Sequence, residues 1–347
     1  MHIYDLDTPA VVIDIDVLER NIQQMAAHCK GLGITLRGHT KSHKNPAIAR
    51  MQVASGSRGI VCQKLGDAEV MAKAGLDDIL MTYNIVGRQK VRRLTELARW
   101  RKMTVTADSE EVVRGISDQA RIDGVRVGVL VEMDTGGKRT GVQSPEAAAQ
   151  LGQLVMGLPG LELRGLMTYP SLTSGKAFMD AAVEKFHELG LPTSIISGGG
   201  TGHEAISKQL GCTEHRSGSY VYEGLSRISR NEDLDPQRCP LRVVTTVVSV
   251  PTRDRVIIDG GMKTFRLFPT YPYGKIIEEP DASIYGMSVE HGHVDVSKCS
   301  RKFKVGDRLT VIPLYQEGVT NLHEEITGFR KGEVELVWRV EGRGKVR

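Results

Sequence analysis

The 347 residues are enough for one large domain and a second, smaller one. Hydrophobic residues make up 40% of the chain and charged residues 25%, which is typical of a soluble globular protein. The 46 Lys and Arg exceed the 42 Asp and Glu by 46 − 42 = 4, and so mild a charge indicates neither a nucleic-acid-binding nor a membrane-binding protein. Five scattered cysteines without a CxxC pair, and a start without a signal-peptide pattern, predict a reduced, cytoplasmic protein.

Residues from about 10 to 230 alternate between short β-rich runs and amphipathic helical segments. Helical patterns lie at residues 46–54, 65–74, 87–99, 109–123, 144–156 and 179–189. The β-rich runs span residues 34–38, 59–63, 79–83, 103–107, 125–132, 163–169, 193–197 and 213–216. This alternation predicts a parallel α/β architecture, and eight such units favour a (β/α)8 barrel over the alternative of a doubly wound sheet.

The pattern changes after residue 235. Four β-rich runs, at residues 241–250, 255–258, 308–312 and 334–340, are separated by Gly, Pro and Asp turns. Such a pattern predicts an antiparallel β-domain. We therefore expect a barrel over residues 10–232 and a β-domain over residues 236–347, with residues 229–240 as the linker and residues 1–9 joining the β-domain.

The segment LRGHTKSHK, residues 36–44, ends the first predicted strand. Active sites of (β/α)8 barrels lie at this end of the strands. Strand alternation would direct four polar side chains to one face, namely those of Arg37, His39, Lys41 and His43. Such a row suits a catalytic wall with Lys41 as an amine nucleophile and His39 and His43 beside it. A solvated loop is the alternative.

Two glycine-containing segments follow the seventh and eighth predicted strands. Glycines let the backbone approach a ligand closely, and phosphate sites of barrels lie after these two strands. The segments SGGGTGHE and HRSGSYVYEG therefore predict a phosphate site, with two ordinary loops as the alternative. The candidate residues are Gly199, Gly200, Thr201, Gly218, Ser219 and Tyr220.

Two further candidates follow the fifth and sixth predicted strands. Arg139, in MDTGGKRTGV, is able to hold an anionic oxygen, and Tyr169, in LMTYPS, is able to stack within the barrel mouth. A surface arginine and a packing aromatic are the alternatives.

The segment RGHTKSHK resembles the R-P-H-x-K-T-H-K segment of the D-threonine aldolase/D-serine dehydratase family. These are pyridoxal-phosphate (PLP) enzymes of fold type III, which share their barrel with alanine racemase. The resemblance continues in order through MDTGGKRTGV, SGGGTG, RSGSY, IDGGMK, VEHGH and VGDRLTVIP, and it spans nearly the whole chain.

The resemblance implies a role for each matched position. Lys41 is the expected PLP-binding lysine, and Arg139 is expected beside the oxygen of the PLP ring. Gln63 and Tyr169 are expected to line the ring. The phosphate is expected to contact the residues of the two glycine-containing segments, Gly199, Gly200, Thr201, Gly218, Ser219 and Tyr220. The family also implies a homodimer that acts on a small amino acid, without a nucleic-acid or membrane partner.

One segment departs from the family in a way that affects chemistry. The divalent-metal segment of the family, P-x-H-x-C or P-x-H-x-D, corresponds to PLYQE at residues 313–317. Tyr315 replaces the histidine, and Glu317 replaces the cysteine or aspartate. A carboxylate is a competent ligand for Mn²⁺, Mg²⁺ or Zn²⁺, whereas tyrosine is a poor one. The sequence leaves metal binding open, with Glu317 and His293 as candidate ligands and Tyr315 as a candidate acid–base group.

These features predict a PLP-dependent lyase that cleaves a D-3-hydroxy amino acid into glycine and an aldehyde, in the manner of D-threonine aldolase. The alternatives are a dehydratase of D-serine or another D-3-hydroxy amino acid and a metal-independent amino acid racemase. A hypothesis from another class is a non-catalytic PLP carrier.

Overall fold

A computed structural model describes residues 1–225, 235–266 and 273–347. The chain divides into two compact units. The first, called the barrel unit, comprises Gln23–Lys41, Pro46–Gly218 and Lys345–Arg347. The second, called the sheet unit, comprises Met1–Ile22, Ser42–Asn45 and Ser219–Gly344. Residues 229–234 of the predicted linker, and with them the predicted barrel end at residue 232, lie outside the described residues.

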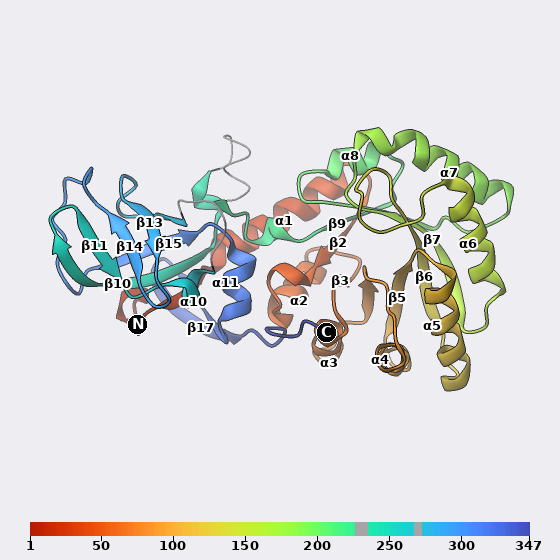
Figure 1. Cartoon of the computed structure of the whole chain (residues 1–347), viewed down its shortest axis with the longest axis horizontal. Coiled ribbons are helices and arrows are strands. Elements are labelled where there is room, and N and C mark those ends of the chain that lie inside the picture. Colours follow the sequence, from red (N-terminus) through yellow and green to blue (C-terminus); the bar gives the residue numbers. More distant parts are fainter. Residues whose placement is uncertain (226–234, 267–272) are drawn as a thin grey trace. The chain divides into compact units, whose positions relative to one another are not determined.

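Eight parallel strands close into a barrel in the barrel unit, as the sequence predicted, and helices surround them (Figure 1). The ring closes between the first and last strands, where Thr35 is in register with Glu214. Every predicted run overlaps a strand, so the prediction of a (β/α)8 barrel is confirmed. The strands are β2 (Thr35–His39), β3 (Ile60–Cys62), β4 (Asp78–Met81), β5 (Lys102–Ala107), β6 (Val127–Met133), β7 (Leu161–Thr168), β8 (Ile195–Gly199) and β9 (Glu214–Ser217).

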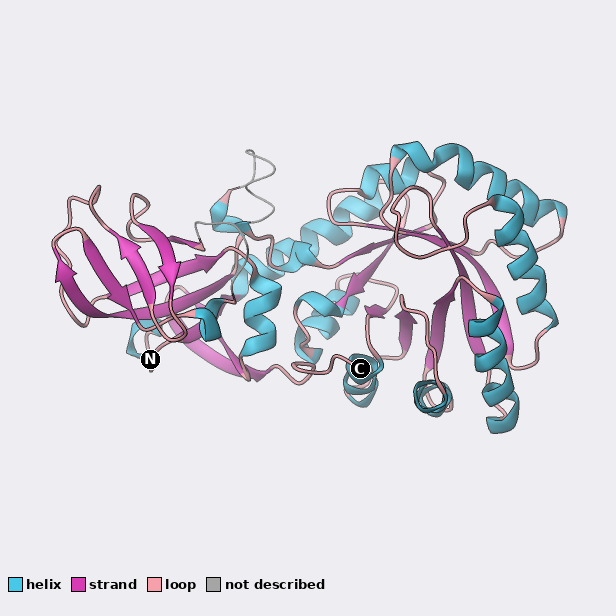
Figure 2. Ribbon diagram, viewed as in Figure 1, coloured by secondary structure: helices cyan, strands magenta, loops and turns pink. Residues whose placement is uncertain are grey.

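Helices cover the outside of these strands (Figure 2). In α4, for example, Val91 and Leu94 are buried, whereas Arg92 on the opposite face is exposed. This spacing is typical of an amphipathic helix on a barrel. The helices are α2 (Pro46–Ala54), α3 (Leu65–Lys73), α4 (Arg88–Ala98), α5 (Glu110–Asp123), α6 (Pro145–Gly157), α7 (Lys176–Glu188) and α8 (Glu204–Gln209).

The sheet unit contains a nine-stranded sheet in the order β11-β14-β13-β12-β15-β10-β1-β16-β17. All its pairings are antiparallel except that of β1 with β16, so the predicted antiparallel β-domain is confirmed with one parallel pair. The strands are β1 (Ala10–Asp14), β10 (Leu241–Thr252), β11 (Arg255–Ile258), β12 (Gly274–Ile276), β13 (Ser283–Met287), β14 (Gly292–Asp295), β15 (Arg308–Pro313), β16 (Glu325–Arg330) and β17 (Glu333–Arg339).

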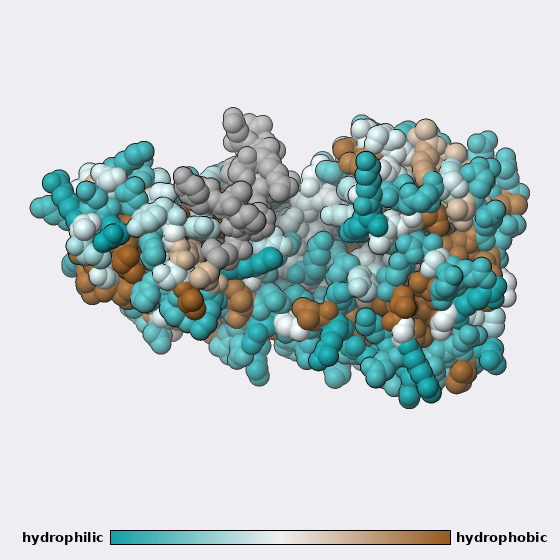
Figure 3. Space-filling model, viewed as in Figure 1, coloured by the Kyte–Doolittle hydropathy of each residue, from teal (hydrophilic) through white to brown (hydrophobic). Residues whose placement is uncertain are grey.

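Three α-helices in the described residues belong wholly or partly to the sheet unit. Helix α1 (Ile15–Gly31) begins in the sheet unit and ends in the barrel unit, and α10 (Met262–Phe265) and α11 (Gln316–Leu322) belong to the sheet unit. In the described part of the chain, no helix has the length and apolar character needed to cross a membrane. On the face in Figure 3, apolar side chains lie scattered among hydrophilic ones, which is normal for a surface in contact with water.

Candidate active site

The first barrel strand leads directly to the lysine that the sequence singled out. Strand β2 ends at His39, and residues Thr40–Ser42 form the single turn of the 3-10 helix η2. Lys41 therefore lies at the carboxyl end of the barrel strands, where active sites of this fold lie. The expected strand alternation through Lys41 and His43 is wrong, because the extended backbone stops before Lys41. His43 belongs to the sheet unit, where it is fully buried and its Nδ1 accepts a hydrogen bond from the Asn45 amide at 3.1 Å.

Two cations lie over one aromatic ring at this end of the barrel. The Nζ of Lys41 is 5.8 Å from the centroid of the Tyr169 ring, and the guanidinium carbon of Arg139 is 4.7 Å from the same centroid. Tyr169 directly follows β7, and Arg139 lies in the loop after β6. Both distances are in the range of cation–π contacts. Three residues from separate sequence segments are thus brought together as expected.

A buried carboxylate holds Arg139 near the ring. The Nη2 of Arg139 is 3.5 Å from Oε1 of Glu132, whose side chain is 3% exposed. Thr140 donates a hydrogen bond to this oxygen at 2.6 Å, and Thr106 donates one to the other oxygen at 3.1 Å. The Arg139 side chain is itself 48% exposed. Its guanidinium is therefore anchored on one side and accessible to an anionic ligand on the other.

His39 and Gln63 hold the backbone at Lys41. The amide of Lys41 donates to Nδ1 of His39 at 3.4 Å, and Nε2 of His39 lies 3.2 Å from Oε1 of Gln63. Since Nδ1 accepts a hydrogen bond, this pattern assigns the ring proton to Nε2, which donates to Oε1 of Gln63. Gln63 is fixed in turn, because its amide group donates to the Thr82 carbonyl at 2.9 Å. His39 thus acts on Lys41 through the main chain.

The glycine-containing loop after β8 packs closely against two side chains of this end of the barrel. A Cβ on Gly199 would lie 2.9 Å from Nη2 of Arg216 and 3.1 Å from Cδ2 of Tyr169. Gly200 has φ +118°, which side-chain-bearing residues rarely adopt. The hydroxyls of Thr201 and Ser217 are 2.7 Å apart and join the loops after β8 and β9. The next residues are Gly218 in the barrel unit, and Ser219 and Tyr220, which begin the 3-10 helix η4 (Ser219–Val221) of the sheet unit.

The loop after β8 carries groups that could contact a ligand phosphate. The backbone at Gly199 and Gly200 is bare, and the neighbouring Thr201 and Ser217 carry hydroxyl groups that are able to donate hydrogen bonds to a phosphate. The loop is also next to Tyr169, the ring over which Lys41 and Arg139 lie. The residues present therefore match a cofactor with a phosphate group and an amine-reactive centre.

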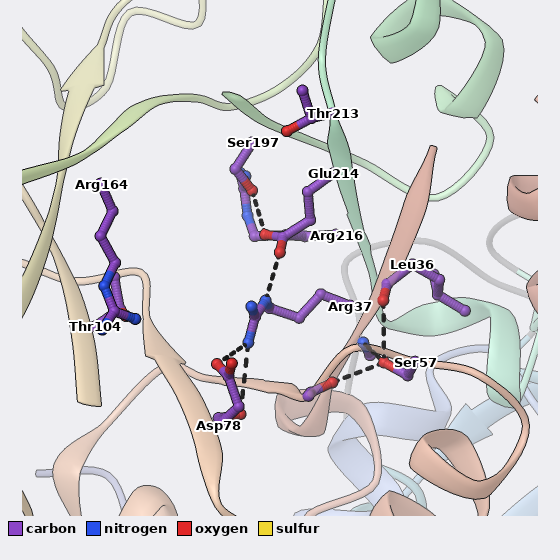
Figure 4. A network of polar contacts seen from close by, with 12 residues as sticks. Leu36, Arg37, Ser57, Asp78, Thr104, Arg164, Ser197, Thr213, Glu214 and Arg216 are labelled. Atoms are coloured by element: carbon purple, nitrogen blue, oxygen red, sulfur yellow. Dashed lines mark hydrogen bonds and ion pairs between the residues drawn. The ribbon is translucent and has the colours of Figure 1, made fainter. Parts of the chain in front are cut away.

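Arg37 was expected to line the site, but it lies in a buried ion-pair network inside the barrel (Figure 4). Its Nη1 is 2.6 Å from Oδ1 of Asp78, and its Nε is 2.8 Å from Oε2 of Glu214. Burial alone lowers the pKa of Arg37, but the two carboxylates outweigh burial and raise it. Burial raises the pKa of Asp78, but Arg37 and Lys102 together outweigh burial and lower it. The network links β2, β4 and β9, so Arg37 supports the site and does not line it.

The sequence reasoning did not single out Arg216, the fully buried arginine that precedes the loop after β9. Its Nη1 donates to the Ser197 hydroxyl at 2.7 Å (Figure 4). Its Nη2 donates to the Thr168 carbonyl at 2.9 Å. Burial is the largest cause that lowers the pKa of Arg216, against the opposing effect of Glu214. The sequence did contain a signal for its interaction with Glu214. Glu214 and Arg216 are two residues apart on one predicted strand, so their side chains share a face.

A second buried network supports the glycine-containing loop from behind. The Gly199 amide donates to the Ser171 hydroxyl at 2.9 Å, which is 2.7 Å from the Ser207 hydroxyl. Ser207 is 2.7 Å from Nδ1 of His215, whose Nε2 is 3.6 Å from Glu204. Burial raises the pKa of Glu204, but His215 and the Gly202 amide outweigh it and lower this pKa to about 2. Glu204 is therefore ionised at neutral pH and orders the loop.

The candidate metal ligands do not assemble into a site in the described residues. Glu317 lies on α11, and both its oxygens accept hydrogen bonds, from Tyr315 at 2.8 Å and from Ser42 at 2.6 Å. His293 lies on β14, where its Nε2 is 2.9 Å from the Ser288 hydroxyl. Among the residues that the structure describes, no three His, Cys, Asp or Glu side chains are grouped so that they could share a metal ion.

Comparisons with known proteins agree with this geometry. Residues 13–225 match the family model of the alanine racemase N-terminal domain, and residues 240–329 match that of a serine dehydratase domain. The chain belongs to the alanine racemase-like family. It is 32% identical to the D-threonine aldolase of an Arthrobacter species and 30% identical to the 3-hydroxy-D-aspartate aldolase of Paracoccus denitrificans (strain Pd 1222). Each alignment covers 98% of this chain and 93% of the relative.

The likeness extends to a solved structure within the branch of the family that contains D-threonine aldolase. The crystal structure of D-threonine aldolase from Filomicrobium marinum superposes with a TM-score of 0.93 at 30% identity, covering 99% of this chain and 98% of the other. The resemblance inferred from the sequence motifs is therefore confirmed over both units of this family member.

Proposed function

We propose that this chain is a PLP-dependent lyase that cleaves a D-3-hydroxy amino acid into glycine and an aldehyde. The observation that carries the proposal is the convergence of Lys41 and Arg139 on the Tyr169 ring, beside the bare glycine backbone after β8. The names of the two relatives, both aldolases of D-3-hydroxy amino acids, support the choice of reaction.

We base the proposed cofactor contacts on the family resemblance, and the contacts around Tyr169 in the barrel unit support them. Lys41 would hold PLP through its amine, Tyr169 and Gln63 would flank the ring, and Arg139 would contact the ring oxygen. The phosphate would lie at the glycine-containing loops, against the backbone of Gly199, Gly200, Thr201, Gly218, Ser219 and Tyr220. When bound, PLP withdraws electrons from the bond that breaks at the amino acid Cα.

The side chains of this chain supply positioning and proton transfer. The Lys41 amine would return a proton to Cα after the Cα–Cβ bond breaks. His39 keeps the Lys41 backbone in place through the 3.4 Å hydrogen bond and is a positioning residue. Tyr315 is the proposed acid–base group for the substrate hydroxyl. His43 stays a proposed catalytic residue, and its Nδ1 accepts a hydrogen bond from the Asn45 amide.

Incubation with four amino acids distinguishes this function from its alternatives. We expect acetaldehyde and glycine from D-threonine, and glyoxylate and glycine from 3-hydroxy-D-aspartate. Pyruvate and ammonia from D-serine would instead identify a dehydratase, and L-alanine from D-alanine a racemase. Lys41→Ala should abolish the activity, and Lys44→Ala is the matched control. A protein that binds PLP and turns over none of the four would contradict the proposal and favour a PLP carrier.

Two further parts of the proposal concern the protein in the cell. We propose a homodimer in the cytoplasm, on the basis of the family resemblance and of five cysteines without a disulfide, four of them buried. Light scattering coupled to size-exclusion chromatography measures the mass directly, and a single chain of 38.1 kDa would contradict the dimer.

A further inference from the structure

Ser171 ties the segment after β7 to the end of β8. It lies two residues after Tyr169 and exchanges two hydrogen bonds with Gly199, the last residue of β8. The Ser171 amide donates to the Gly199 carbonyl at 2.9 Å, and the Gly199 amide donates to the Ser171 hydroxyl at 2.9 Å. His203 adds a third bond, because its Nδ1 lies 2.7 Å from the Ser171 carbonyl and must carry the proton that this oxygen accepts. A single serine therefore joins the segment that carries Tyr169 to the glycine-containing loop.

A row of buried polar side chains lies behind Ser171, within the barrel unit. The Ser207 hydroxyl is 2.7 Å from the Ser171 hydroxyl and 2.7 Å from Nδ1 of His215. Nε2 of His215 lies 3.6 Å from Oε1 of Glu204. Ser171, Ser207 and His215 are fully buried, and Glu204 is 5% exposed. A Cβ on Gly198 would collide with both serine hydroxyls, so the row requires a glycine at that position.

Only one direction of these hydrogen bonds gives each hydroxyl proton an acceptor. Each serine hydroxyl supplies one proton. If Ser171 donates to Ser207, and Ser207 donates to Nδ1 of His215, both protons are used. If Nδ1 of His215 donates instead, either the Ser207 or the Ser171 proton has no acceptor among the residues that the structure describes. A buried hydroxyl without an acceptor is costly, so the bonds run from Ser171 to His215.

Glu204 favours the same direction through its charge. Its carboxylate is ionised at neutral pH, and its Oε1 accepts a hydrogen bond from the Gly202 amide at 2.8 Å. A carboxylate attracts an N–H group and repels the lone pair of a bare ring nitrogen. The ring proton of His215 is therefore assigned to Nε2, which faces Glu204, and Nδ1 is left to accept from Ser207.

We propose that Glu204, His215, Ser207 and Ser171 form a one-way row of hydrogen bonds that positions the loops after β7 and β8 for the cofactor. The row fixes the acceptor of the Gly199 amide, and with it the glycine backbone next to the Tyr169 ring. The four side chains act on a ligand through these loops, so they are positioning residues. Their role toward PLP rests on the proposed function, whereas their role in ordering the two loops does not.

Two substitutions at His215 test the row, because they differ in one acceptor. His215→Asn offers an amide oxygen near the place of Nδ1, whereas His215→Leu offers none, and both lack Nε2. Hydrogen–deuterium exchange of the full chain, followed by mass spectrometry, measures the protection of the Gly199 amide. We expect nearly wild-type exchange in His215→Asn and about 10-fold faster exchange in His215→Leu. His187→Leu, at an exposed histidine on α7, is the matched control and should exchange like the wild type. Equal exchange in the two His215 variants would overturn the proposal.

Titration of the full chain with PLP, followed by visible absorption, tests the role toward the cofactor. The dissociation constant of PLP should rise about 10-fold in His215→Leu and return toward the wild-type value in His215→Asn. Ser171→Ala removes the acceptor of the Gly199 amide directly, should weaken PLP binding as much, and decides the matter if His215→Leu does not fold. Wild-type PLP affinity in Ser171→Ala would overturn the positioning role. A wild-type chain that binds no PLP would instead contradict the proposed function, and the exchange measurement would still decide whether the row orders the loops.

Discussion

Replacing Arg37 by Met should strongly destabilise the barrel. The substitution removes a guanidinium that is 3% exposed and leaves the Glu214 carboxylate, 1% exposed, without its ion-pair partner. Breaking a buried pair on one side costs about 3–5 kcal/mol, because an uncompensated charge stays in the interior. Asp78 is 16% exposed and is the less affected of the two carboxylates. For a unit of this size, the melting temperature should fall on the order of 10 °C.

Thermal unfolding followed by circular dichroism measures this effect, and α5 supplies the matched control. Arg114 and Glu110 form an exposed pair four residues apart, with side chains 52% and 57% exposed. Arg114→Met should therefore cost only about 0.3–0.5 kcal/mol. Adding Glu214→Gln to Arg37→Met should recover part of the loss, because the stranded charge is removed. Equal melting temperatures for Arg37→Met and Arg114→Met would refute the reasoning.

Two other predictions concern the glycine-containing loop. Gly199→Ala should abolish the visible absorption of bound PLP, because its Cβ would lie 2.9 Å from Arg216 and 3.1 Å from Tyr169, whereas Gly115→Ala, with nothing within 4 Å, should retain it. Glu204→Gln should reduce the loss of unfolding free energy that occurs as the pH falls below about 4.3. The folded pKa of Glu204, about 2, lies below an unfolded value of about 4.3, so its stabilisation is full above about pH 4.3 and is lost as the pH falls toward 2. Equally steep losses of unfolding free energy between about pH 5 and 3 in both proteins would contradict this.

Much of the barrel follows from local sequence patterns. The eight short apolar runs separated by amphipathic segments each overlap a strand. Lys41 was predicted to lie at a strand end because it follows the first of these runs. In the sheet unit, β12, β13, β14 and β16 were missed because they are short and contain glycine or polar residues, which weaken the alternation. The pairing of β1 with β16 joins segments about 300 residues apart and leaves no local signal.

Side-chain partners were harder to predict than strand positions. Strand alternation predicts that the Arg37 side chain lies on the opposite face of β2 from its two sequence neighbours. Its partners Asp78 and Glu214, however, are 41 and 177 residues away in the sequence. The alternation of residues along the strand therefore could not show whether Arg37 lines the site or forms a buried ion pair. The hydrogen bond from Tyr315 to Glu317 is local in the sequence. Ser42, which also donates a hydrogen bond to Glu317, is 275 residues away from it in the sequence. Long-range contacts of this kind depend on the closed fold.

The central claim, that Lys41 holds PLP, is tested most directly by chemical trapping. Reduction of the PLP-loaded protein with sodium borohydride fixes the cofactor to the amine that holds it, and mass spectrometry of the digested protein locates that amine. We predict the modification at Lys41 and none at Lys44, whose Nζ lies 3.4 Å from the Gly342 carbonyl. Modification at Lys44, or at no lysine of the segment 36–44, would contradict the account.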